Sequence, residues 1–219
     1  MAIAFVSSTG NEFAAATTYT QSAVSVSGTN TYALVFVGLR SATADVTSVT
    51  FNGVAMTELG DVLNAVPSLH VWVFGLAGPT TGDVVITGDT SLAAEVITSI
   101  YQGVHQTVST GTVATNSAVA SSAVTVNVTS ATDELVVDCC GWNAGNGPAS
   151  VGADQTDRKQ SPASGNGISM NIASSDEAGA TTTTMSWTVE IGGSWATLGV
   201  PIKPAGAAAA ANHWLLMGV

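Results

Sequence analysis

Short runs in which apolar and polar residues alternate, separated by turn-forming residues, recur along nearly the whole chain. Successive side chains of a β-strand point to opposite faces, so this period of two is typical of strands with one buried face. The 3.6-residue spacing that marks an amphipathic helix is nearly absent. About a dozen short strands at such spacing favour an all-β fold, an antiparallel two-sheet sandwich with jelly-roll-like connections.

The expected strands are bounded by glycine, proline, asparagine, aspartate and serine. They cover residues 3–8, 23–27, 32–39, 47–51, 54–59, 70–75, 83–87, 95–101, 123–128, 135–142, 156–160, 168–173, 182–188 and 195–202. The strongest local signal is Asn52-Gly53, because both residues tolerate a positive φ and together close a two-residue hairpin turn. The glycine-rich stretch 143–150 is expected to form an exposed loop.

The chain divides into one β-sandwich domain, residues 1–205, and an alanine-rich apolar tail, residues 206–219. Alanine favours helix, so we expect a short helical or extended tail after Pro204. The tail carries Trp214, Leu215, Leu216 and Met217. Exposed apolar clusters usually mark contacts, so we favour docking of these four residues into a neighbouring subunit over folding back onto their own sandwich.

Charge is sparse and mostly negative, with four Lys and Arg against fifteen Asp and Glu and a formal net charge of -11. Nucleic-acid phosphates would be repelled, so no nucleic-acid partner is expected. No stretch approaches the roughly 18 apolar residues of a membrane span, so no membrane partner is expected either. The N-terminus lacks a basic signal-peptide region and resembles a first strand, which favours synthesis in a cytoplasm.

Residues that carry chemistry do not gather at recognisable spacings. The three histidines lack metal-ligand spacing, and no zinc site or other cofactor is expected. The adjacent Cys139 and Cys140 should point to opposite faces of a strand as buried free thiols. Carboxylate pairs stand beside turn residues and are interpreted as solvated loop charges, with calcium binding left as an alternative. They are Asp133 and Glu134, Asp154 and Asp157, and Asp176 and Glu177. We therefore expect a protein that is not an enzyme.

Tryptophans offer one candidate ligand site. Trp72, Trp187 and Trp195 lie inside expected strands and are interpreted as core residues. Trp142 adjoins the glycine-rich loop, and with Asn143 and Asn146 it forms a candidate ligand loop. An exposed ring at Trp142 would provide a platform on which a sugar could stack, so carbohydrate is a candidate partner.

Four segments in this order resemble a β-sandwich module of phage and phage-derived virion structural proteins. They are Ser48–Thr57, Val84–Thr87, Ser99–Gln106 and Trp195–Pro204. The resemblance spans residues 30–205 and implies a virion protein of the capsid decoration or fibre type, without catalytic residues. It favours a capsid decoration, or cement, protein that is made in the host cytoplasm. Such a protein would bind further copies of itself and the major capsid protein or other virion proteins.

Two other functions remain open at this point. One is a carbohydrate- or receptor-binding module of a tail fibre, which would need an exposed tryptophan near residues 143–150. The other is a self-assembling filament or surface-layer subunit, which would share the homo-oligomeric contacts of a decoration protein.

Overall fold

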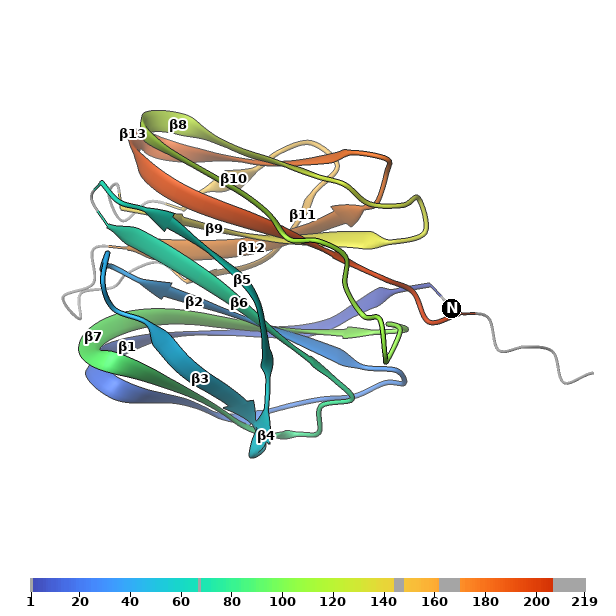
Figure 1. The fold of residues 1–219 in the computed structure, drawn as a ribbon. Coiled ribbons are helices and arrows are strands. Elements are labelled where there is room, and N and C mark those ends of the chain that lie inside the picture. Colours follow the sequence, from blue (N-terminus) through green and yellow to red (C-terminus); the bar gives the residue numbers. More distant parts are fainter. Residues whose placement is uncertain (1, 67, 144–147, 162–169, 207–219) are drawn as a thin grey trace, which may run out of the picture.

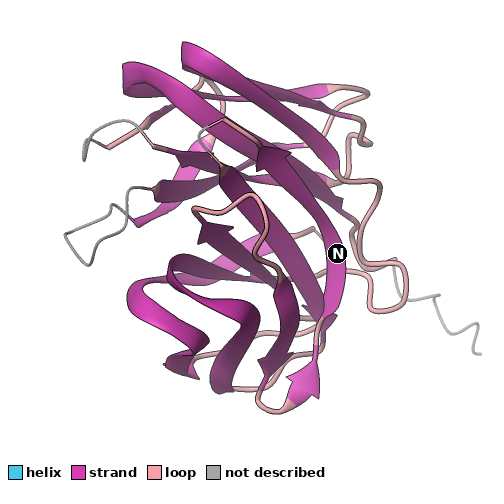
Figure 2. Cartoon of the chain, turned by 60° about the vertical axis from the view of Figure 1, so that its left-hand side comes forward, coloured by secondary structure: helices cyan, strands magenta, loops and turns pink. Residues whose placement is uncertain are grey.

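The computed structural model describes residues 2–66, 68–143, 148–161 and 170–206. These residues form thirteen strands and contain no helix (Figure 2). The strands are β1 (Ala4–Val24), β2 (Tyr32–Leu39), β3 (Val46–Phe51), β4 (Val54–Ala55), β5 (Thr57–Asn64), β6 (Leu69–Ala77), β7 (Gly82–Gln102), β8 (Ala114–Val128), β9 (Leu135–Trp142), β10 (Ser150–Val151), β11 (Thr156–Ser161), β12 (Asn171–Ala178) and β13 (Thr183–Ile202). The all-β prediction is confirmed. The predicted helical tail lies outside the described residues.

The strands form two antiparallel sheets, so the two-sheet, sandwich-like prediction is also confirmed (Figure 1). The first sheet has the order β4-β3-β7-β2-β6-β5, with β1 paired to β7. The second has the order β10-β13-β9-β12-β11, with β8 paired to β13.

Each sheet curls, because its long last strand changes partners along its length. Residues 94–101 of β7 pair with β2, whereas residues 84–88 pair with β3. In the same way, residues 195–202 of β13 pair with β9, and residues 187–188 pair with β10. Each sheet therefore contributes an inner layer that faces the other sheet and an outer layer that covers its own inner one (Figure 1).

Hydrophobic cores fill the spaces between these layers. The core between the inner layers includes Leu34, Phe36, Val71, Ile97, Cys139, Ile172 and Leu198. The core inside the first sheet includes Val35, Phe51, Trp72, Phe74 and Ile86. The core inside the second includes Cys140, Trp142, Trp187 and Trp195. Alternate residues of an inner strand thus enter different cores, which explains why all eight residues of β2 are buried and seven are apolar.

Two sequence predictions about core residues follow from this layering. Cys139 and Cys140 are buried free thiols that enter different cores, as predicted for neighbours in a strand. Trp72, Trp187 and Trp195 are buried core residues, also as predicted.

The two halves of the chain have the same topology. β1, β2, β3, β5, β6 and β7 correspond in order and pairing to β8, β9, β10, β11, β12 and β13. Tyr32 pairs with both Tyr101 and Ala77, and its counterpart Leu135 pairs with both Ile202 and Ala178. Even the irregularity of β5 at Leu59 recurs in β11 at Arg158. We call β1–β7 repeat 1 and β8–β13 repeat 2.

The predicted hairpin at Asn52-Gly53 is confirmed. Phe51 pairs with Val54 across the turn, and φ is 47° at Asn52 and 76° at Gly53. A Cβ at Gly53 would meet no atom within 4 Å, so only the backbone conformation selects glycine there.

Replacement of Gly53 by valine is therefore expected to lower the free energy of unfolding by about 1 to 2 kcal/mol, because a β-branched residue resists positive φ. Chemical denaturation would measure this, with Gly53→Asn as the control that tolerates the conformation. Equal stability of the valine and asparagine variants would contradict the strain argument.

Candidate functional site

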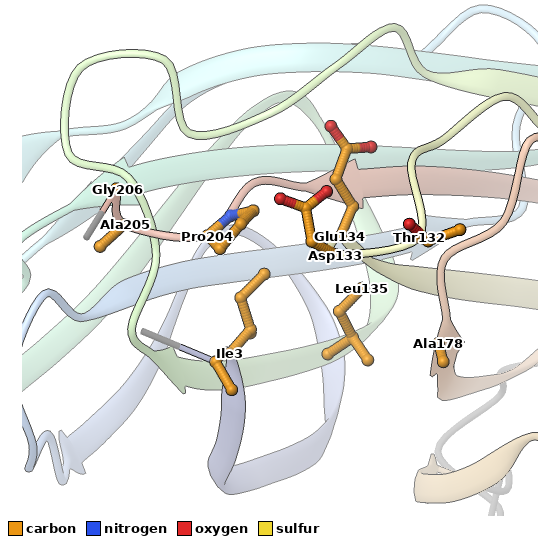
Figure 3. Close-up of a pocket in the computed structure, with 10 residues that line it drawn as sticks. Ile3, Thr132, Asp133, Glu134, Leu135, Ala178, Pro204, Ala205 and Gly206 are labelled. Carbon is orange, nitrogen blue, oxygen red and sulfur yellow. The ribbon is translucent and has the colours of Figure 1, made fainter.

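An open surface pocket of about 570 Å³ lies at the point where the described chain ends (Figure 3). Its volume lies within the range of small-ligand and peptide side-chain pockets. It is lined by Ala2, Ile3, Thr132, Asp133, Glu134, Leu135, Ala178, Pro204, Ala205 and Gly206. We call it the terminal pocket, because it joins both ends of the described chain.

Local hydrogen bonds fix the pocket wall formed by residues 131–134, the turn that precedes β9. The Glu134 backbone N–H donates to the Ala131 carbonyl at 3.0 Å, and Glu134 Oε2 accepts from the Ala131 N–H at 3.1 Å. The Gly179 N–H then donates to the Glu134 carbonyl at 2.9 Å, which ties this turn to the end of β12. The wall is thus preformed, with no ligand needed to shape it.

The terminal pocket has apolar walls and an acidic rim. Ile3, Leu135 and Pro204 are half-buried and line it, while the carboxylate of Asp133 is exposed at its edge (Figure 3). Such a site suits an apolar ligand that carries a donor or a positive charge, and the acidic rim disfavours an anion.

The candidate ligand loop lacks its aromatic platform. Trp142 is only 1% exposed and packs with Trp187 and Trp195 in the core of the second sheet. Asn143 bonds to the adjacent strand, where its Oδ1 accepts from the Ser194 N–H at 3.0 Å. A sugar ring therefore has no access to Trp142 as a stacking surface. Asn146 lies outside the described residues, as do Trp214, Leu215, Leu216 and Met217 of the tail.

Asp138, which sequence reasoning missed as a site residue, is a fully buried carboxyl in β9. Its Oδ1 accepts from the Ser175 N–H at 3.0 Å and the Ser175 hydroxyl at 2.6 Å, and its Oδ2 accepts from Trp187 Nε1 at 2.7 Å. Burial raises the pKa of Asp138 to about 7, although these hydrogen bonds lower it. Its contacts lie inside the second sheet, so its role there is structural.

Asp176 corrects the interpretation of the carboxylate pairs as solvated loop charges, because it is only 2% exposed in β12. Arg158 clamps it through Nε and Nη2 at 2.7 and 2.8 Å, and the Tyr101 hydroxyl donates to it at 3.1 Å. Arg158 also lies over the ring of Phe5, 4.4 Å from its centroid. Phe5 and Tyr101 belong to repeat 1, so this cluster joins the two repeats.

Glu95 is a third buried carboxyl, in β7, and its Oε2 accepts from the Ser161 hydroxyl. Burial raises the pKa of Glu95 to about 8, so the group is mostly neutral at pH 7. Within the described residues its Oε1 has no hydrogen-bond partner.

His70 forms a contact of another kind, on the edge of the first sheet. Its Nε2 lies 2.7 Å from Asp61 Oδ2, and its ring stacks on Trp72 with centroids 3.5 Å apart. These contacts hold the edge strand β5 against β6.

No three His, Cys, Asp or Glu side chains gather as a metal site among residues 2–66, 68–143, 148–161 and 170–206. In the same described ranges, no helix is long and apolar enough to cross a membrane. Comparison with protein-family models, curated proteins and solved structures finds no match to this chain.

Proposed function

We propose that this protein is a structural component of a phage virion, a capsid decoration protein that assembles in multiple copies. The proposal depends mainly on the position at which the described chain ends, just before the apolar tail. Ala205 and Gly206, the last described residues, line an open surface pocket, so the described chain reaches the segment with Trp214–Met217 at the protein surface. Four consecutive large apolar residues there favour a contact with another chain.

Strand edges give the proposal independent support. β8 carries no charged residue over its 15 residues, and β1 carries only Glu12 over 21. Each pairs with a single neighbour within the described part of the chain. Proteins that must stay monomeric commonly protect such edges with lysine or proline. Long edges with so few charged residues suit main-chain pairing with further copies or with other virion proteins.

The two other candidate functions have less support. A sugar-binding fibre module would use an exposed aromatic platform, and the ring of Trp142 is buried. A filament or surface-layer subunit would use the same edges and tail, but its contacts would propagate openly instead of closing around a symmetry axis.

Sedimentation velocity of the full-length protein between about 1 and 100 µM tests the proposal. Contacts in the range of typical specific interfaces would give discrete oligomers that dissociate on dilution. A single monomeric species at every concentration would contradict the assembly function, and species that grow without limit would favour the filament alternative.

A further inference from the structure

The two repeats differ at the corner where the last strand ends. In repeat 1, the residues after β7 form backbone hydrogen bonds with the segment that leads into β2. The Gly103 N–H donates to the Thr29 carbonyl at 3.0 Å, and the Val104 N–H donates to the Asn30 carbonyl at 2.9 Å. The side-chain amide of Gln106 adds a bond to the Thr31 carbonyl at 3.2 Å. Val104 is fully buried at this corner, beside a smaller pocket of about 250 Å³ that is lined in part by Tyr32 and Ala77.

In repeat 2, the counterparts of Gly103 and Val104 are Pro204 and Ala205, and they do not repeat these bonds. Proline has no N–H to donate, and the Ala205 N–H donates to the Gly103 carbonyl at 2.7 Å, in repeat 1. The backbone carbonyl of Lys203 likewise accepts from the His105 N–H at 2.8 Å. The end of β13 is thus drawn toward repeat 1.

The chain that enters β9 at Thr132 and Asp133 is therefore separated from the segment Pro204–Gly206. The terminal pocket opens between these two walls (Figure 3). It occupies the corner of repeat 2 that corresponds to the corner of Val104 in repeat 1, and its volume exceeds the 250 Å³ or so of the pocket there.

We propose that the terminal pocket receives the C-terminal segment, residues 207–219, of a second copy of this chain. In this arrangement Trp214, Leu215 and Leu216 occupy the corner that Val104 and its neighbours occupy in repeat 1. The inference rests on the proposed assembly function and deepens it, because it names the surface that accepts the tail.

Three features favour this occupant. The apolar walls at Ile3, Leu135 and Pro204 match the only run of large apolar residues in the segment. His213 directly precedes that run, and its ring is the one side chain of the segment able to carry a positive charge toward Asp133 at the rim. Thirteen residues, at up to about 3.3 Å each, also give enough reach to a neighbour.

The same segment is less suited to its own pocket. Its chain leaves from the pocket wall at Gly206, so it would have to reverse direction at once. Gly206 is the one turn-forming residue at this exit, and the five alanines that follow it, residues 207–211, favour a helix over a tight reversal. A second copy is therefore the occupant that the connection favours.

Two full-length variants test the inference. Ala178→Arg places a long side chain in the terminal pocket, where it can also pair with Asp133, and Ala178 is exposed, so no core is disturbed. The control is Ala55→Arg, at an exposed strand position of repeat 1 that does not line the terminal pocket. We expect the apparent dissociation constant of the oligomer, measured by sedimentation, to rise at least about tenfold for Ala178→Arg and to change little for Ala55→Arg.

Mixing a pocket variant with a tail variant shows whether the terminal pocket binds the tail of a neighbouring copy or the tail of its own chain. A tail variant with Trp214, Leu215 and Leu216 changed to alanine keeps its pocket, and Ala178→Arg keeps its tail. We expect each variant alone to be mainly monomeric and their equimolar mixture to form a one-to-one complex. Recovery in the mixture would also show that both variants are folded.

Other outcomes overturn the inference in distinguishable ways. Oligomers of Ala178→Arg as stable as those of the unchanged protein would place the tail elsewhere and leave the assembly function intact. Two monomeric variants that do not associate when mixed would also exclude exchange of tails between copies. A monomeric unchanged protein would remove the assembly function itself.

Discussion

The free energy of unfolding is expected to fall by several kcal/mol as the pH rises from about 4 to about 8. Two buried carboxyls cause this. The pKa of Asp138 rises from 3.8 to about 7 in the folded protein, and that of Glu95 rises from 4.5 to about 8. Desolvation is the main cause for both, because burial penalises the charged form.

The sign follows from proton binding. Between the unfolded and folded pKa values, the folded state holds protons that the unfolded chain has released, so stability decreases with pH. Each such proton lowers the unfolding free energy by about 1.4 kcal/mol per pH unit, so Asp138 contributes up to about 4 kcal/mol across its window. The contribution of the two carboxyls is fully present below about pH 4 and is lost as the pH passes 7 to 8.

Urea unfolding at several pH values measures how steeply the free energy of unfolding falls with pH. The variant Asp138→Val shows how much of this slope comes from Asp138. Valine is the residue at the equivalent position of repeat 1, Val35. This variant is expected to be less stable at acidic pH, because the donors of Ser175 and Trp187 lose their acceptor, and to show a shallower slope. Asp154→Asn, in an exposed turn, is the control: it removes a charge that helps to raise the pKa of the half-buried Glu177, so it should change the slope only slightly. Stability that stays flat or rises between pH 5 and 8 would contradict the assignment.

Deletion of residues 206–219 is expected to abolish assembly while the sandwich remains folded. Burial of Trp214, Leu215 and Leu216 against a neighbour stabilises the contact by roughly 1.5 to 3 kcal/mol per side chain before ordering costs. Because the proposal places these side chains on a neighbouring copy, the melting temperature of the truncated chain should change by only a few degrees. Thermal unfolding and sedimentation of the same truncated sample measure both effects.

The opposite result would assign the tail a different role. If the truncated chain unfolds more easily but whatever remains folded assembles normally, the tail is an intramolecular lid. The sequence of the tail would then contribute to the fold instead of to contacts between copies.

Strands buried on both faces were the most predictable part of the fold. The predicted limits of β2 and β9 match the structure, because each is an apolar run that turn residues bound at both ends. The long strands were harder to predict. Residues 88–94 contain glycine, aspartate and threonine and resemble a loop, yet they continue β7 through its bend because β1 curls alongside. For the same reason 182–188 and 195–202 form one strand, and the predicted strand 23–27 is only the end of β1.

The two repeats share one short stretch of identical residues in the sequence. Ala77-Gly78 and Thr80-Thr81 recur as Ala178-Gly179 and Thr181-Thr182, and both pairs lie after matching strands. Elsewhere the counterparts differ in chemistry, as Val35 differs from Asp138, because each repeat fills its own core with different side chains. The period-two pattern records burial, which many different residues satisfy equally well.

The candidate site was less predictable than the strands. A carboxylate inside the apolar run of β9 was a visible signal for Asp138, but its partners Ser175 and Trp187 come from strands far along the chain. The terminal pocket combines Ala2 with Pro204, a pairing that only the packing of the two repeats creates. The apolar tail was identified from the sequence, whereas the surface proposed to receive it required the structure.

Electron microscopy of the purified full-length assembly tests the central claim most directly. We expect several copies arranged around closed symmetry, with residues 207–219 of one copy in the terminal pocket of the next. Single chains, or tails that fold back into their own pockets, would contradict it.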